Sequence, residues 1–111
     1  MSDTHAMETR EVLAEIKRNL EDLYGERLKG VLLYGSEARG EARPDSDIDV
    51  MVLLEGPVVG FREIQTILTV VYPIELELLD RVIHVHPVDY MDFVLQEKPV
   101  YQEAKREGIA L

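Results

Sequence analysis

The sequence contains no cysteine, few basic residues and no long apolar run. Without cysteine there is no disulfide, no thiolate nucleophile and no metal site built on cysteine. The 12 lysine and arginine residues are outnumbered by 22 aspartate and glutamate residues, which gives a formal net charge of -10. Nucleic-acid affinity comes largely from a broad basic face, so we expect no nucleic-acid partner. No apolar run approaches the roughly 20 residues that span a bilayer, so we expect no membrane partner.

Length and composition are those of one soluble domain. The chain has 111 residues, of which 46% are hydrophobic and 31% charged, and this is enough for one core. We expect a single domain over residues 1–111, with residues 1–7 as a flexible tail. The polar N-terminus lacks the apolar core of a secretory signal, so a cytoplasmic location is expected. So small a chain has little room to select a second substrate, which favours a partner protein; a homo-oligomer is an alternative.

Hydrophobic periodicity predicts that helices and strands alternate along the chain. Helices are predicted over residues 8–24, 61–71, 88–95 and 100–107. Strands are predicted over residues 28–34, 47–54, 82–88 and 109–111. Residues 74–79 are ambiguous, because Pro73 can bend a continuing helix while the alternating pattern also suits a strand; we interpret them as helical. The alternation predicts an α/β (α+β) fold with a small mixed β-sheet flanked by helices.

Residues 35–41 have a pattern that suits a phosphate group. Gly35 and Ser36 follow a predicted buried strand and precede a predicted helical turn. Glycine lets a backbone approach a ligand closely, and amides at a helix start favour phosphate oxygens. Arg39 could neutralise a phosphate with its planar guanidinium or support the loop. Glu37 and Glu41 would repel an anion, so we expect both side chains to point into solvent.

Two carboxylates follow the predicted phosphate-binding turn. Asp47 and Asp49 are two residues apart at the start of a predicted strand, so both side chains lie on one face. Mg²⁺ usually takes one or two protein carboxylates and completes its shell with water and substrate phosphates. A bridging carboxylate could also serve two metal ions during the transfer of a nucleotide. A phosphate-binding turn that faces a carboxylate pair is what nucleotidyl transfer requires.

These motifs resemble those of a known superfamily. Residues 35–40, Gly-Ser-x-Ala-Arg-Gly, and residues 46–50, Ser-Asp-Ile-Asp-Val, resemble the signature of the DNA polymerase β-like nucleotidyltransferases. The short length and the ending Arg-Glu-Gly-Ile at residues 106–109 resemble the minimal nucleotidyltransferase (MNT) family. The resemblance implies the nucleotidyltransferase fold, a small mixed sheet with flanking helices.

The resemblance also implies an activity and a partner. Gly35 and Ser36 would bind the triphosphate of ATP or another nucleotide, and Asp47 and Asp49 would be catalytic and bind Mg²⁺. Minimal members commonly accompany a HEPN-domain protein, as the antitoxin of a toxin–antitoxin system. Some of them inactivate that toxin by transferring AMP from ATP to a tyrosine hydroxyl. The expected function is therefore a Mg²⁺-dependent transfer of AMP to a hydroxyl of a HEPN-domain protein.

The superfamily uses a third acidic residue, and its position in this sequence is open. The third predicted strand has no carboxylate in its middle, where His84 and His86 alternate onto one face. Neutral imidazole suits Mn²⁺ or Zn²⁺ better than Mg²⁺, and histidine can act as a general base. If residues 74–79 were the strand instead, Glu75 or Glu77 would be the third acid.

Because the third acidic residue is not located, two functions of different classes remain open. One is the active nucleotidyltransferase described above. The other is a catalytically weak or inactive module of the same fold that neutralises or regulates a partner by binding. An acidic chain would suit a basic, RNase-like partner electrostatically. A third carboxylate on the face of Asp47 and Asp49 would distinguish the two.

Overall fold

A mixed four-stranded sheet, with strand order β3-β2-β1-β4, organises the chain. A computed structural model describes residues 9–43, 45–78 and 81–111. The strands are β1 (Leu28–Tyr34), β2 (Ile48–Leu54), β3 (Ile83–Asp89) and β4 (Ile109–Ala110). β1 pairs antiparallel with β2 and β4, whereas β2 pairs parallel with β3. The predicted mixed sheet with flanking helices is confirmed.

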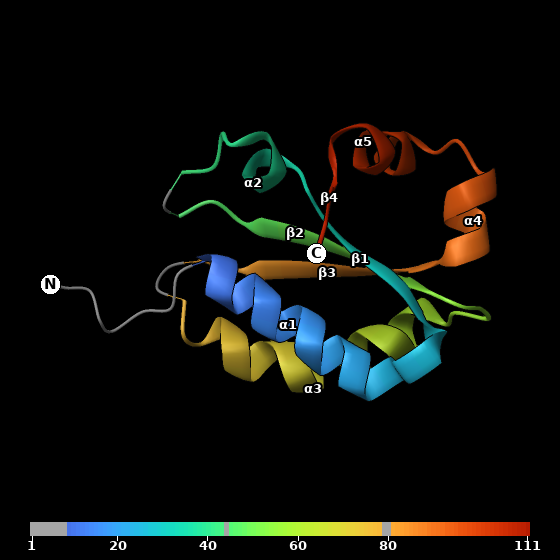
Figure 1. The fold of residues 1–111 in the computed structure, drawn as a ribbon, viewed down its shortest axis with the longest axis horizontal. Coiled ribbons are helices and arrows are strands. Elements are labelled where there is room, and N and C mark those ends of the chain that lie inside the picture. Colours follow the sequence, from blue (N-terminus) through green and yellow to red (C-terminus); the bar gives the residue numbers. More distant parts are fainter. Residues whose placement is uncertain (1–8, 44, 79–80) are drawn as a thin grey trace, which may run out of the picture.

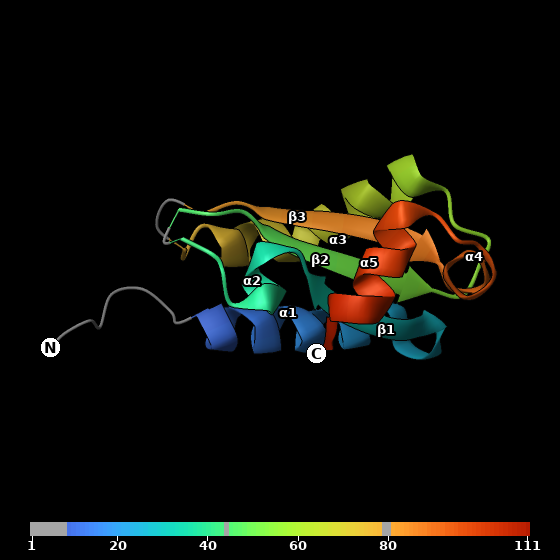
Figure 2. The same ribbon diagram turned by 90° about the horizontal axis from the view of Figure 1, so that it is seen from above.

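Helices cover both faces of this sheet (Figures 1 and 2). The helices are α1 (Thr9–Tyr24), α2 (Ser36–Arg39), α3 (Gly60–Glu75), α4 (Tyr90–Leu95) and α5 (Pro99–Glu107), with a 3-10 turn η1 (Gly25–Arg27) after α1. In Figure 1, α1 and α3 lie below the sheet, and α2 and α5 lie above it. In the part of the chain that is described, no helix is long and apolar enough to cross a membrane.

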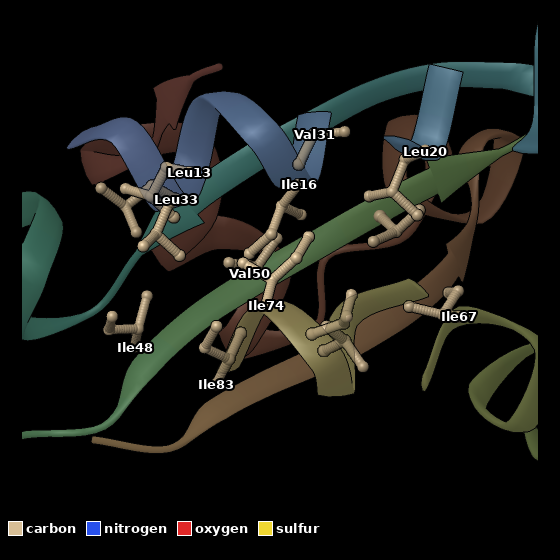
Figure 3. Packing of buried hydrophobic residues seen from close by; sticks show 14 of the residues in the cluster. Leu13, Ile16, Leu20, Val31, Leu33, Ile48, Val50, Ile67, Ile74 and Ile83 are labelled. Carbon is tan, nitrogen blue, oxygen red and sulfur yellow. The ribbon is translucent and has the colours of Figure 1, made fainter. Parts of the chain in front are cut away.

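The larger hydrophobic core lies between the sheet and the pair α1 and α3 (Figure 3). The apolar residues of α1 recur at helical spacing, which turns one stripe of the helix inward. β2 supplies every second side chain to this core and is buried along nearly its whole length. Fully buried residues include Val12, Ile16, Leu20, Ile48, Val50, Val52, Leu54 and Ile67.

A smaller core lies on the opposite face of the sheet, under α4 and α5. The alternate residues of β2, Met51 and Leu53, pack there with Phe93 of α4 and Tyr101 of α5. β2 is buried on both faces, and Asp49, its second residue, is the one residue of the strand that is only partly buried. The polar start of β2 is therefore the part of the strand that can meet a ligand.

The element boundaries agree with the predictions except around two segments. α3 continues through Pro73 to Glu75, so the helical interpretation is confirmed for residues 74–75. It is wrong for residues 76–78, which form a turn, and the strand alternative is wrong for residues 74–78; residue 79 lies outside the described residues. The predicted helix start at Val88 is also wrong, because Val88 and Asp89 belong to β3. The Asp89 carboxylate caps α4 by accepting from two of its backbone amides. The predicted tail, residues 1–7, lies outside the described residues.

A buried carboxylate joins α1, η1 and α3. Glu63 of α3 is 7% exposed and accepts hydrogen bonds from the Tyr24 hydroxyl at 2.8 Å and from Nη2 of Arg27 at 2.7 Å. Burial alone would raise the pKa of Glu63, but the hydrogen bonds from Arg27 and Tyr24 and the Arg27 charge together hold it below its usual range. The carboxylate is therefore ionised in the folded chain at neutral pH.

We expect Glu63→Gln to lower the free energy of unfolding by about 1.5–3 kcal/mol at pH 7, as for a hydrogen bond to a charged group. Because folding lowers the pKa of Glu63, its contribution is present above the unfolded value of about 4.3 and is lost as the pH falls through the folded value. The difference between variant and wild type should therefore shrink below about pH 4. Urea unfolding followed by circular dichroism at both pH values measures it.

Glu26→Gln is the matched control for this measurement, because Glu26 is an exposed carboxylate on the neighbouring turn. Its effect should stay within about 0.5 kcal/mol. A Glu63→Gln loss that is equally large at neutral and acidic pH would contradict the assigned ionisation.

Candidate active site

Asp47 and Asp49 lie at the start of β2, where the strand leaves the core. Asp49 shares a face of β2 with Met51 and Leu53, which face α4 and α5. Asp47 directly precedes the strand. Their side chains are 54% and 32% exposed, so a ligand can reach both carboxylates.

Gly35 brings the predicted phosphate-binding turn against Asp49. Its backbone, with φ 77° and ψ −155°, occupies a region that is essentially restricted to glycine. A Cβ atom at this position would lie 2.7 Å from Oδ2 of Asp49. Only the absence of a side chain therefore allows the turn and the carboxylate to approach each other so closely. Ser36 follows at the first residue of α2.

Two histidines of β3 lie beside the two aspartates. Nε2 of His84 is 2.9 Å from Oδ2 of Asp47, and Nε2 of His86 is 3.9 Å from Oδ1 of Asp49. The parallel register places the Cα of His84 opposite that of Asp49. Burial lowers the pKa of His86 and outweighs the opposing effect of the Asp49 charge, while His84 lowers it further. The two imidazoles thus occupy the sheet face that carries the carboxylate pair.

Neither glutamate considered as the third acid lies on that face. Oε2 of Glu75 accepts a hydrogen bond from the backbone amide of Ile83 at 2.6 Å, which ties the end of α3 to the start of β3. Glu77 is exposed in the turn after α3. Across residues 9–43, 45–78 and 81–111, no three side chains of histidine, cysteine, aspartate or glutamate are grouped so that they could hold a metal ion.

The donor set fits a magnesium ion that is shared with a substrate. Asp47 and Asp49 supply the one or two carboxylates that Mg²⁺ usually takes from a protein, leaving the other ligand positions to water and phosphate. Gly35 holds the adjacent backbone close to this pair without a side chain between them. The nitrogen atoms of His84 and His86 suit Mn²⁺, but an imidazole would have to move to join both carboxylates around one ion, because the described residues form no such group of three.

An apolar pocket of about 290 Å³ is lined in part by Tyr34 and His86, the two residues that flank Asp49. Ile64 of α3 and Tyr101 of α5 form other parts of its wall. Burial, with smaller contributions from the charges of Asp49 and Glu103, raises the pKa of Tyr34 to about 12. The Tyr34 phenol is therefore neutral and adds no negative charge beside Asp49.

Arg39 fastens α2 to the loop that follows it and to α5. Its Nε donates to Oε1 of Glu41 at 2.8 Å, and its Nη1 donates to Oε2 of Glu107 at 3.2 Å. Glu103 lies 3.7 Å from the same Nη1 atom. Of the two predicted roles of Arg39, this geometry fits the support of the loop.

Arg81 makes contacts that the sequence analysis missed. Its Nη2 donates to Oε1 of Glu37 at 2.5 Å, its Nε to the Ser46 carbonyl at 2.8 Å, and its Nη1 to the Thr9 hydroxyl at 3.2 Å. Glu37 is paired with Arg81 and its side chain is only 23% exposed, so the prediction that it points into solvent is wrong. Glu41 is paired with Arg39 but is 64% exposed, so for Glu41 the prediction is confirmed. Glu37 and Arg81 are 44 residues apart, so no local pattern could have indicated the pair.

Curated relatives of this chain occur in Methanocaldococcus jannaschii under the name "Putative protein adenylyltransferase". MJ1215 is 34% identical over 76 residues, which is 67% of this chain and 86% of that protein. MJ0141 is 37% identical over 49 residues, or 44% of this chain and 50% of that protein. MJ1379 is 47% identical over 45 residues, or 40% of this chain and 43% of that protein. The matched part thus spans about half of the latter two relatives.

Solved structures share the fold at low sequence identity. The spectinomycin adenyltransferase AAD(9) of Enterococcus faecalis, solved with ATP and spectinomycin, has a TM-score of 0.73 at 19% identity, over 94% of this chain and 56% of that one. A toxin–antitoxin structure with AMP-PNP gives 0.56 at 16% identity, over 93% and 72%. The toxin–antitoxin MntA-HpeT, mutant Y104A, gives 0.57 at 17% identity, over 95% and 72%.

The sequence model of one family matches almost the whole chain. It is described as "Nucleotidyltransferase domain" and matches residues 13–111. That span contains the Gly35 turn, the carboxylate pair and all four strands. The chain belongs to the nucleotidyltransferase domain family, and so to a family of enzymes.

Proposed function

We propose that this chain transfers AMP from ATP, with Mg²⁺, to a hydroxyl group of a partner protein. The observation that carries the proposal is the contact of the Gly35 turn with Asp49, which sets a phosphate-binding backbone beside a carboxylate pair. Relatives named as protein adenylyltransferases support the choice of AMP and of a protein acceptor. A structural neighbour solved with ATP supports the choice of nucleotide.

Each part of the site has a defined task in this reaction. Gly35 and Ser36 bind the triphosphate through backbone amides and the serine hydroxyl, and Asp47 and Asp49 hold Mg²⁺. When bound, Mg²⁺ supplies positive charge that stabilises the phosphate oxygens in the transition state. The acceptor hydroxyl gives its proton to an imidazole of β3, His84 or His86, which acts as the general base. Its oxygen forms a bond to the α-phosphorus, the bond from that phosphorus to the oxygen that bridges to the β-phosphorus breaks, and pyrophosphate leaves. By holding Mg²⁺, the two carboxylates would orient the α-phosphate toward the acceptor.

We propose that His84 and His86 occupy the place that the third acidic residue has in other members of the superfamily. Both rings lie beside the carboxylate pair, one within 2.9 Å of Asp47 and the other 3.9 Å from Asp49. Imidazole in place of a third carboxylate adds no further negative charge and offers nitrogen donors. This arrangement favours Mn²⁺ as an effective substitute for Mg²⁺.

The proposed acceptor is a HEPN-domain toxin, with this chain as its antitoxin. Structural neighbours that are toxin–antitoxin complexes support this choice of partner. The formal net charge of -10 would steer the chain toward a basic partner. The acceptor would bring its hydroxyl to the exposed side of Asp47 and Asp49.

A second candidate function rests on the missing third carboxylate. Within the described segments, no third acidic side chain joins Asp47 and Asp49 in a group that could hold a metal ion. A chain with this fold and weakened catalysis could still neutralise or regulate its partner by binding alone. Metal-dependent nucleotide binding distinguishes this module from the enzyme.

We expect ATP to bind in the presence of Mg²⁺, and the double variant Asp47→Asn, Asp49→Asn to weaken that binding by more than about tenfold, or about 1.4 kcal/mol. The amides cannot replace the negative charge that attracts the metal ion. Isothermal titration calorimetry with Mg²⁺, and separately with Mn²⁺, measures the affinity. Asp22→Asn is the control, since Asp22 is an exposed aspartate of α1. If the wild type binds no ATP with either metal, the proposed enzyme activity is overturned and the binding module is the function that remains.

Gly35→Ala should weaken ATP binding, whereas Gly40→Ala should not. Both glycines have positive φ angles, 77° and 74°, so both substitutions strain the backbone, by about 1–3 kcal/mol. Only at Gly35 does the added Cβ meet Asp49, because nothing lies within 4 Å of a Cβ at Gly40. Thermal melts report the shared strain and calorimetry reports the affinity. Equal affinities of the two variants would contradict the close contact as the basis of the site.

We expect the wild type to bind ATP more tightly with Mn²⁺ than with Mg²⁺, and His86→Asp to shift this preference toward Mg²⁺. A carboxylate is a harder ligand than an imidazole and restores the oxygen donors that Mg²⁺ favours. Calorimetric titration of ATP with each metal gives the ratio of affinities, and His5→Asp near the N-terminus is the control. If the ratio of the Mn²⁺ to the Mg²⁺ affinity is the same in His86→Asp as in the wild type, His86 does not occupy the place of the third acidic residue.

A further inference from the structure

We propose that Arg81 is a positioning residue of the nucleotide site, which neutralises Glu37 next to the triphosphate and holds the Gly35 turn against the strand of Asp47. The inference rests on the proposed ATP site and deepens it. Arg81 does not touch the reacting atoms in this scheme. It acts through Glu37 on α2 and through Ser46, the residue before Asp47.

The guanidinium of Arg81 reaches three segments that are distant in sequence. Its donors contact the Thr9 hydroxyl at the start of α1, the Glu37 carboxylate of α2 and the Ser46 carbonyl before β2. The Arg81 side chain is only 10% exposed. A planar group with five donors in a fixed fork can join such segments, and a single ammonium group cannot do so equally well.

The position of Glu37 explains why it needs a positive partner. It directly follows Ser36 in the turn that we assign to the triphosphate, and its side chain is 23% exposed. An unpaired carboxylate there would repel a bound polyphosphate, and water would screen the repulsion only in part. The ion pair with Arg81 cancels this charge where the phosphates would bind.

The second acid near the turn differs from Glu37 in its surroundings. Glu41 is paired with Arg39, but the two side chains are 64% and 37% exposed. Solvent and salt screen exposed charges strongly, so such a pair contributes little. The Arg81–Glu37 pair is therefore the one through which charge near the nucleotide is controlled.

The Ser46 contact gives Arg81 its second effect. By donating to the carbonyl directly before Asp47 while it holds Glu37, one side chain sets the spacing between the phosphate-binding turn and the carboxylate pair. Loss of the guanidinium would free both segments. The expected consequence is weaker nucleotide binding with the carboxylates themselves unchanged.

A double-mutant cycle separates the charge effect from simple structural support. The variants are Arg81→Met, Glu37→Gln and both together, with Arg18→Met on the exposed face of α1 as the control. Calorimetry with ATP and Mg²⁺ gives the affinity at low and high salt, and thermal melts give the stability. We expect Arg81→Met to weaken ATP binding about tenfold, more at low salt than at high salt. Glu37→Gln should change it less than about threefold, and the double variant should recover most of the loss.

Rescue by the second substitution is the outcome that a purely structural role would not produce. If the double variant binds ATP as weakly as Arg81→Met, or if the loss is the same at both salt concentrations, the neutralising role is overturned. Where Arg81→Met does not fold, Arg81→Lys takes its place: it keeps the positive charge beside Glu37, so its ATP affinity should lie close to that of the wild type, and a tenfold loss in Arg81→Lys would overturn the neutralising role. If the wild type binds no ATP with either metal, the proposed function itself fails before the variants are compared.

Discussion

The site depends on one close approach, that of the backbone at Gly35 to the carboxylate of Asp49. The antiparallel register of β1 and β2 places Tyr34 opposite Asp49, so the residue after Tyr34 must pass beside that carboxylate. A side chain at position 35 would occupy the same space as Oδ2 of Asp49. The absence of a Cβ atom therefore allows the Gly35 turn, the proposed phosphate site, to lie beside Asp49.

The packing of β2 explains why the chemistry lies at its first residues. β2 is an inner strand of the sheet, and the side chains on its two faces pack into two different cores. Most of the strand is therefore inaccessible to solvent. A strand held in this way is a rigid support, and a group at its open end is positioned more accurately than one on a loop. Asp49 has this support from β1 on one side and β3 on the other.

The proposed nucleotide site lies in an acidic chain, so the negative charge around it must be controlled if a polyanion is to bind. Here the two glutamates near the turn are each paired with an arginine, and one of these pairs is well shielded from solvent. The strand beside the aspartates carries two imidazoles, which avoid a third negative charge on that face. Asp47 and Asp49 themselves stay accessible to solvent, where a cation would bind.

Local patterns in the sequence determined most of the elements and indicated the residues of the candidate site. The apolar spacing of α1, the β-branched run of β2 and the Gly-Ser and Asp-x-Asp motifs are each signals within a few residues. Residues 74–79 were ambiguous because Pro73 and the alternating pattern supported different structures, and packing of Ile74 into the core selected the helix. Only the tertiary structure decided that Arg81 meets Glu37 and that His84 lies beside Asp47, because these contacts join separate elements. Periodicity records which face of an element is buried, but the partner across the fold depends on strand register and helix placement, which no single segment encodes.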